Sequence, residues 1–316
     1  MNDRFGKVYN YSEMPPLPQS LNIELNNTCN QECVFCPYHG PFSRKKLVPA
    51  SIPNSIVKNI IDQAAEVGIG SKELGFYLAG EVFIRRDFEE LVAYAKDRGF
   101  KYTFITTNGA LAEPNRIKKV VDAGIDSIRF SINAADARMY ERIHGRDDFN
   151  KVVDNIKFLR KYIDDNNLSV ATSISCVITK KTKAIQNSIK MMFEEYVDDI
   201  LFIPVILNRL NSTNEFRNEF ELVDESKLEY IDEFICPMLF DTMYINANLE
   251  VVPCCDMYET EYAVYDLKKD FDLEKAWNSD RMHYYRDIFL QGGSMDGTRC
   301  SNCVLRMHGV ERLVME

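Results

Sequence analysis

A repeated alternation of strand-like and helix-like segments is the feature that most constrains how this 316-residue chain can fold. Between Leu21 and about Pro204, short runs rich in β-branched and apolar residues alternate with longer segments whose apolar residues recur at helical spacing. Gly68, Gly99 and Gly124 follow the first three of these longer segments, where a left-handed residue often ends a helix. The pattern predicts a parallel sheet with crossover helices.

Six strands are expected in this region, at Leu21–Leu25, Glu73–Leu78, Tyr102–Thr106, Ser127–Ser131, Val170–Ile178 and Ile200–Pro204. A complete barrel of this type needs eight strand–helix units, so six units predict an α/β fold with a partial, open (β/α)6 barrel. A polar stretch at 211–215 ends the pattern. We therefore expect an N-terminal extension (1–17), the partial barrel (18–210), a linker (211–235) and a small cysteine-rich α+β domain (236–316).

The last of these segments is expected to contain a hairpin and two helices. Thr242–Ile245 and Glu250–Val252 flank the turn Asn-Ala-Asn, and Asn tolerates the positive φ that such turns need. Helical segments are expected around Leu273–Trp277 and Asp280–Leu290.

The charge and the apolar content exclude some classes of partner. A net charge of −10 argues against a nucleic-acid partner, which would need a surplus of Lys and Arg. The apolar runs are only strand-sized and the N-terminus lacks the apolar core of a secretory signal, so we expect a cytoplasmic protein without a membrane partner. In such a chain, nine cysteines are better explained by metal binding or catalysis than by disulfides.

Three cysteines with the spacing C-x3-C-x2-C directly follow the first expected strand: Cys29, Cys33 and Cys36. The loop at the carboxyl end of such a strand is where α/β barrels and sheets bind ligands. Three thiolates can ligate three irons of a [4Fe-4S] cluster and leave the fourth iron open. Structural zinc is the alternative, but it needs a fourth ligand that this segment lacks.

This segment, with the aromatic Phe35 before the third cysteine, resembles the signature of the radical S-adenosylmethionine (SAM) superfamily. The resemblance implies that the open iron chelates the amino and carboxylate groups of SAM, and that an electron from the cluster cleaves SAM to methionine and a 5′-deoxyadenosyl radical. The stretch Leu-Ala-Gly-Glu at 78–81 is similar to the family's Gly-Gly-Glu motif, whose backbone and carboxylate hold the SAM ammonium. Arg142 or Arg146 could reach the SAM carboxylate, with a solvated surface position as the alternative for each. The implied SAM contacts are Phe35, Ala79, Gly80, Glu81, Thr107, Asn108, Ser131 and Asn133.

The C-terminal cysteines form a second group. Together with the stretches 252–255 and 277–279, they resemble the SPASM and shorter twitch extensions of radical SAM enzymes. Two auxiliary clusters would need more cysteines than the six left here, so the resemblance implies one closed [4Fe-4S] cluster that transfers electrons. Four cysteines also suit structural zinc, which is the alternative. The implied ligands are Cys236, Cys254, Cys300 and Cys303.

Two cysteines and the histidines remain. Cys176, in the fifth strand, is expected to be a buried apolar residue. Cys255 lies beside an expected ligand and could donate a hydrogen atom to a substrate radical, with packing or ligation as the alternative. His39 is expected to line the active site. The other histidines are expected in loops or at the surface: His144, His283 and His308.

The family's chemistry implies hydrogen abstraction from a substrate. Oxidation follows if the auxiliary cluster accepts the remaining electron, and epimerisation follows if Cys255 returns a hydrogen. Peptide-modifying relatives often carry an added N-terminal domain, whereas about 20 residues precede the first strand here, so we expect a small molecule, a sugar or aminocyclitol. A flavodoxin or ferredoxin is the expected electron donor. The alternatives are a peptide-modifying enzyme of this family and a non-enzymatic iron–sulfur or zinc protein.

Overall fold

The computed structural model describes residues 16–43, 46–205, 210–211, 214–221, 229–231 and 234–306. In these residues, nine strands form one sheet in the order β6-β5-β4-β3-β2-β1-β7-β8-β9. The first six strands run parallel and in chain order, which confirms the expected α/β class. They are β1 (Ser20–Ile23), β2 (Glu73–Phe76), β3 (Thr103–Thr107), β4 (Ser127–Ser131), β5 (Ala171–Ile178) and β6 (Asp199–Pro204).

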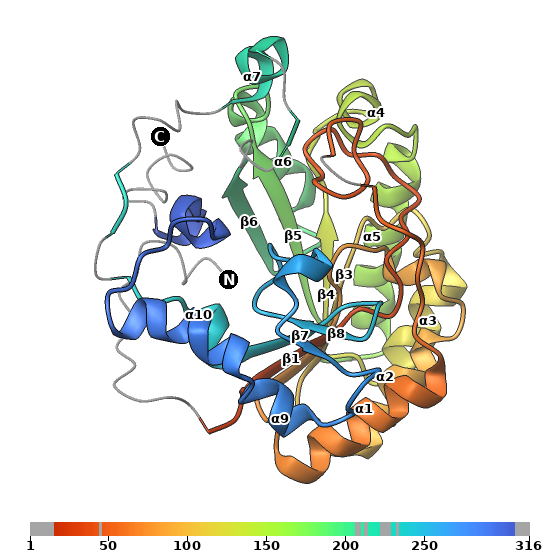
Figure 1. Ribbon diagram of the computed structural model, residues 1–316. Coiled ribbons are helices and arrows are strands. Elements are labelled where there is room, and N and C mark those ends of the chain that lie inside the picture. The colour runs from red at the N-terminus through yellow and green to blue at the C-terminus, as the bar shows by residue number, and fades with distance from the viewer. Residues whose placement is uncertain are drawn as a thin grey trace.

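The crossover helices are amphipathic, and several of them lie together along one side of the sheet (Figure 1). In α1 (Asn54–Val67), the apolar residues Val57, Ile61 and Ala64 fall on one face and are buried. Gly68 ends this helix with a φ of +88°, and its N–H donates to the carbonyl of Ala64. The other helices of this region are η2 (Val82–Ile84), α2 (Phe88–Asp97), α3 (Pro114–Asp122), α4 (Ala137–His144), α5 (Phe149–Asp165), η3 (Lys183–Ile185) and α6 (Gln186–Phe193).

Helix α4 is an addition to the expected alternation, because two helices instead of one follow β4. Asp136 caps its N-terminus by accepting the backbone N–H of Met139 at 2.8 Å. Gly145, with a φ of +71°, ends it directly after His144. The helix is only two turns long, and its short apolar face offers too few periodic positions for a sequence pattern to separate it from the loop.

The C-terminal segment extends the same sheet. β7 (Thr242–Ile245) pairs in parallel with β1, and β8 (Glu250–Val252) and β9 (Tyr265–Asp266) continue the sheet with antiparallel pairing. The expected hairpin is confirmed, but its left-handed residue is Leu249, with a φ of +59°, and not an asparagine. Asn246 shapes the turn through its side chain, which accepts the backbone N–H groups two and four residues later, each at 3.0 Å.

One hydrophobic core includes residues of both segments, such as Leu21 and Trp277, each completely buried. Among the described residues, no helix combines the length and the apolar character needed to cross a membrane. The remaining helices are α7 (Asn214–Phe220), α8 (Pro237–Asp241), η5 (Thr260–Tyr262), α9 (Leu273–Trp277), α10 (Asp280–Leu290), η6 (Arg299–Asn302) and η7 (Val304–Arg306).

Candidate active site

The first three cysteines and the carboxyl ends of β2 to β5 surround one cavity of about 330 Å³. Cys29, Cys33 and Cys36 lie on the loop that follows β1. The structure thus brings together residues from five neighbouring strands and the loops that follow them, as expected where parallel strands end at one edge of a sheet. The individual roles of these residues in SAM binding stay predictions. All eight expected SAM contacts line the cavity: Phe35, Ala79, Gly80, Glu81, Thr107, Asn108, Ser131 and Asn133.

Each cysteine sulfur of this first group lies within reach of at least one nitrogen that can donate a hydrogen bond. Hydrogen bonds to ligating sulfurs are among the main devices by which proteins tune iron–sulfur clusters. The donor atoms are Nδ2 of Asn108 to Cys29 (3.8 Å), Nδ1 of His144 to Cys33 (3.5 Å) and the backbone N of His39 to Cys36 (3.3 Å).

The donor set fits a cluster better than a single metal ion. Burial raises the pKa of all three thiols, to about 12 for Cys29, and neighbouring thiolates raise the pKa of Cys33 further. Such thiols are ionised when a strongly cationic partner ligates them. In the described part of the chain, no three His, Cys, Asp or Glu side chains converge closely enough to hold one ion. A cluster spreads its ligands over separate irons and so suits wider spacing.

Glu81 fixes the loop that follows β2. Its carboxylate accepts hydrogen bonds from the hydroxyl of Thr107 and the backbone N–H of Asn108, each at 2.7 Å, and from the backbone N–H of Phe83 at 3.0 Å. Burial raises the pKa of this carboxyl group, and the three hydrogen bonds oppose that rise. The carboxylate therefore supports the loop backbone in this structure, and its part in holding the SAM ammonium stays a prediction.

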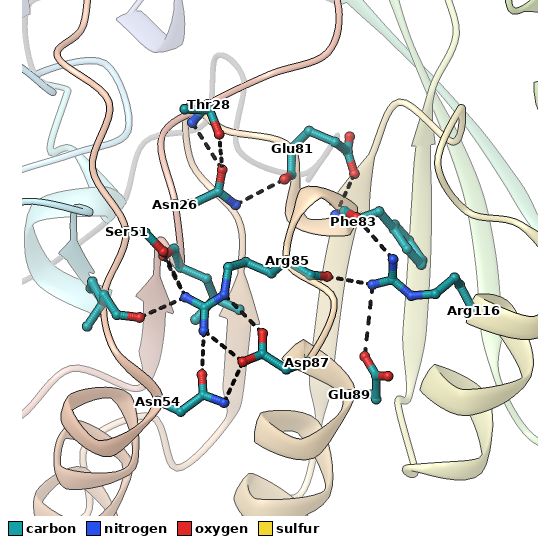
Figure 2. A network of polar contacts seen from close by, with 12 residues as sticks. Asn26, Thr28, Ser51, Asn54, Glu81, Phe83, Arg85, Asp87, Glu89 and Arg116 are labelled. Carbon is teal, nitrogen blue, oxygen red and sulfur yellow. Dashed lines mark hydrogen bonds and ion pairs between the residues drawn. The ribbon is translucent and has the colours of Figure 1, made fainter.

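A polar network below this loop joins it to the end of β1 and the start of α1 (Figure 2). The side-chain oxygen of Asn26 accepts hydrogen bonds from the backbone N–H of Thr28 at 3.0 Å and from its hydroxyl at 2.7 Å. The side-chain amide nitrogen of Asn26 donates to the backbone carbonyl of Glu81 at 3.1 Å. The guanidinium of Arg85 donates to a carbonyl after β1 at 3.2 Å and to one before α1 at 2.7 Å. Arg116 donates to backbone carbonyls of the 83–85 segment. Asn26, Arg85 and Arg116 were not expected from the sequence, because the carbonyl groups to which they donate lie 31 to 60 residues away in the chain.

The four cysteines of the second group also come together. Cys236 and Cys300 are buried, and Cys254 and Cys303 are half-buried. Burial is the largest cause that raises the pKa of Cys236, Cys254 and Cys300, and charges on other members of the group add to it. Each of the four thiols therefore lies within electrostatic range of at least one other member of the group.

Cys255 lies beside this second group and also contacts the first cysteine loop. Its carbonyl accepts the hydroxyl of Tyr38 at 3.2 Å, and the Tyr38 ring packs against Tyr258 with 5.1 Å between centroids. Cys255 is half-buried and is not among the described residues that line the cavity. Its role as a hydrogen donor stays a prediction. Cys176 is completely buried in the core, as expected.

Glu24, directly after β1, links the C-terminal segment to residues 77–81 after β2, which we call the SAM loop because of their expected role. Its Oε1 accepts the backbone N–H groups of Ala79 at 2.7 Å and Gly80 at 3.1 Å. Its Oε2 accepts the backbone N–H of Ala247 at 2.9 Å and the hydroxyl of Tyr258 at 2.6 Å. Burial outweighs these donors and raises the pKa of Glu24 to about 7. No pattern in the sequence indicates this residue.

The expectation for His144 was wrong. Its side chain is completely buried at the end of α4, and burial lowers its pKa to about 3. The spacing of four from the buried Tyr140 was the available signal. His39 is half-buried beside Ala79, but it is not among the described residues that line the cavity. His283 is half-buried, and His308 lies outside the described residues.

The two candidate arginines do not line the cavity in the described structure. Arg142 is exposed and pairs with Glu219. Arg146 is 53% exposed in its side chain and lies 3.2 Å from Glu32. In this structure, both arginines therefore lie at the solvated surface, which was the alternative to binding the SAM carboxylate.

Comparisons with known proteins agree with this geometry. The radical SAM superfamily matches residues 23–192, and the SPASM iron–sulfur cluster-binding domain matches residues 236–304. A probable GTP 3′,8-cyclase of Sulfurisphaera tokodaii is 29% identical over 238 residues, which are 74% of this chain and 68% of that protein. One of Saccharolobus solfataricus is 32% identical over 157 residues, 50% of this chain and 46% of that protein.

Three solved structures share the fold at low sequence identity. BtrN in complex with AdoMet and 2-DOIA has a TM-score of 0.54 and 14% identity, and the match covers 88% of this chain and 89% of that chain. Streptococcus suis SuiB bound to precursor peptide SuiA has a TM-score of 0.65 and 18% identity, with 93% of this chain and 71% of that chain covered. The structure of anSMEcpe with bound AdoMet has a TM-score of 0.67 and 16% identity, with 86% of this chain and 81% of that chain covered. At these identities the likeness concerns the fold alone.

The first domain match covers more than half of the chain and includes the loop with Cys29, Cys33 and Cys36. The second includes all the cysteines of the C-terminal group. SAM and two [4Fe-4S] clusters are the cofactors of this combination. The chain therefore belongs to the radical SAM superfamily and carries a SPASM-type iron–sulfur domain.

Proposed function

We propose that this enzyme removes a hydrogen atom from a hydroxyl-rich small molecule, a sugar or an aminocyclitol, and leaves it oxidised or epimerised. When bound, SAM and the first cluster supply the 5′-deoxyadenosyl radical that takes the hydrogen. The observation that carries the substrate class is the cavity lining beyond the expected SAM contacts, which includes three residues with hydroxyl groups: Tyr77 directly after β2, Thr106 in β3 and Ser175 in β5. These groups can exchange hydrogen bonds with substrate hydroxyls.

The absence of cations from the lining supports the same class. The curated relatives are named for GTP, and proteins hold triphosphates with arginine, lysine or metal ions. Among the described residues that line the cavity there is no Lys or Arg. Its one carboxylate, on Glu81, already accepts three protein hydrogen bonds. A ligand that is recognised through its hydroxyl groups matches this lining better than a triphosphate.

The substrate class is tested by SAM cleavage. The protein is reconstituted with iron and sulfide without oxygen, and 5′-deoxyadenosine is measured with SAM and a low-potential donor, flavodoxin or ferredoxin. We expect sugars or aminocyclitols to raise 5′-deoxyadenosine formation above the substrate-free rate, and the Cys33→Ser variant to remove the activity. Stimulation by GTP alone, or by peptides alone, would contradict the proposed substrate class.

The fate of the substrate radical is tested at Cys255. In oxidation, the radical passes one electron to the auxiliary cluster and loses a proton, so the product lacks two hydrogens. In epimerisation, the Cys255 thiol returns a hydrogen to the opposite face, and an external electron and proton restore the thiol. In deuterated water, deuterium at an inverted carbon that is lost in Cys255→Ala identifies epimerisation. An oxidised product formed equally by both proteins identifies oxidation.

A further inference from the structure

The three N–H donors around the first cysteine group differ in origin. Asn108 and His39 belong to loops at the SAM site, whereas His144 reaches Cys33 from the end of α4. Its ring is completely buried, and both ring nitrogens have protein partners. Because hydrogen bonds to both nitrogens offset the cost of burying this polar ring, these partners determine what the ring can do.

The partners of the ring fix its tautomer. The backbone N–H of Asn133 lies 3.2 Å from Nε2, and the Asn133 side-chain amide nitrogen lies at the same distance. A backbone amide can only donate, so Nε2 is the acceptor and Nδ1 carries the proton. The Nδ1–H faces the side-chain oxygen of Gln31 at 2.9 Å and the sulfur of Cys33 at 3.5 Å. The ring therefore presents a donor, and not an acceptor, to this sulfur.

The ring is also held in place from several sides. It stacks on Tyr140 with 4.0 Å between centroids and 9° between planes, and the Tyr140 hydroxyl accepts a hydrogen bond from Gln31 at 2.7 Å. The backbone N–H of Glu32 donates to the His144 carbonyl at 3.1 Å. The end of α4 and the cysteine loop thus form one unit, and the donor geometry is set before a cluster binds.

We infer that His144 is a positioning residue that shares its Nδ1–H with the Cys33 sulfur and thereby sets the reduction potential of the first cluster. An N–H donor withdraws charge from a ligating thiolate and stabilises the reduced cluster, which carries one more negative charge. Loss of this donor lowers the potential. The inference rests on ligation by Cys33 and not on the proposed substrate.

Two variants with side chains of nearly equal shape distinguish the effect of the His144 hydrogen bond on the reduction potential from the effect of packing. His144→Asn keeps an N–H close to the place of Nδ1, and His144→Leu removes it. In redox titrations of the reconstituted protein followed by EPR, we expect the leucine variant to shift downward by about 59 mV, which is a tenfold change in a one-electron equilibrium. The asparagine variant should recover most of that shift. Equal shifts in both variants, or an unchanged potential at full iron content in the leucine variant, would overturn the inference.

A second measurement decides the matter if the leucine variant does not hold iron. The wild-type protein is labelled with histidine that carries nitrogen-15 only in the ring, so that the backbone donor of His39 stays silent. Pulsed EPR of the reduced cluster should then show a weak nitrogen-15 coupling that disappears in labelled His144→Asn. A wild-type spectrum without this coupling, or a coupling that persists in the variant, overturns the inference. Neither readout needs a substrate, so both are independent of the proposed function.

Discussion

Gly80 is the residue whose size the SAM loop tolerates least. A Cβ atom added there would lie 2.0 Å from the carbonyl oxygen of Asn26, closer than any real contact. That oxygen belongs to the backbone just before the cysteine loop and cannot turn aside as a side chain could. Glycine at this position therefore follows from the close approach of two loops, one that bears the cysteines and one that is expected to hold the SAM ammonium.

We expect Gly80→Ala to lower the free energy of unfolding of the apoprotein by about 1–3 kcal/mol, the usual cost of overpacking, and to weaken SAM binding. Urea denaturation and the SAM dissociation constant check both effects. Ala79→Gly is the matched control, because it removes an atom at the neighbouring position. Stability of Gly80→Ala within about 0.5 kcal/mol of the wild type would show that the two loops can separate at little cost.

The residues that the sequence could predict are those whose partners are local or whose spacing is diagnostic. Cys29, Cys33 and Cys36 were predictable because one short segment contains all of them. Glu24 and His144 were not, because their contacts, to Tyr258 and to Cys33, come from segments 234 and 111 residues away. The chemistry of a buried polar residue depends on such distant partners, and no local pattern contains them.

At the scale of elements, periodicity predicted the strands and helices of the barrel region, but not what joins their ends. The pairing of β7 with β1 depends on contacts between strands at opposite ends of the chain. The periodicity of apolar residues likewise predicts neither the short helix η2 nor the network of Figure 2. In that network, Arg85 holds together the end of β1, the start of α1 and the end of η2.

We expect Arg85→Lys to destabilise the apoprotein by about 1–3 kcal/mol, because an ammonium group cannot supply the guanidinium fork and leaves carbonyl acceptors without a donor. Only 14% of the Arg85 side chain is exposed, so water does not easily replace the lost donors. The control is Arg86→Lys at the adjacent exposed position. Urea denaturation compares the two variants, and equal stabilities would mean that the network is dispensable.

At the scale of the whole molecule, the two cysteine-bearing segments share a sheet, a core and a buried carboxylate. One carboxylate oxygen of Glu24 accepts hydrogen bonds from the SAM loop, and the other accepts hydrogen bonds from the C-terminal segment. Tyr258, one of these donors, also packs against Tyr38 of the first cysteine loop. A change in either segment can therefore reach the other through a path of only a few residues.

The titration of Glu24 makes this link measurable. Its pKa is about 7 in the folded state, above the ordinary value of 4.5, so between these values the folded state keeps a proton that the unfolded state releases. The contribution of Glu24 to the free energy of unfolding therefore falls as the pH rises from about 5 to 8, by up to about 3 kcal/mol. Glutamine cannot ionise, so Glu24→Gln lacks this fall.

The measurement is urea denaturation of reduced apoprotein at several pH values between 5 and 8, for the wild type and Glu24→Gln. His144 acts in the opposite direction, because its lowered pKa costs stability as the pH falls below its ordinary value of 6.5. That contribution is common to both proteins and cancels in their difference. We expect the wild type to lose stability relative to the variant as the pH rises. Parallel pH profiles would mean that Glu24 is ionised throughout, held by its four donors against the cost of burial.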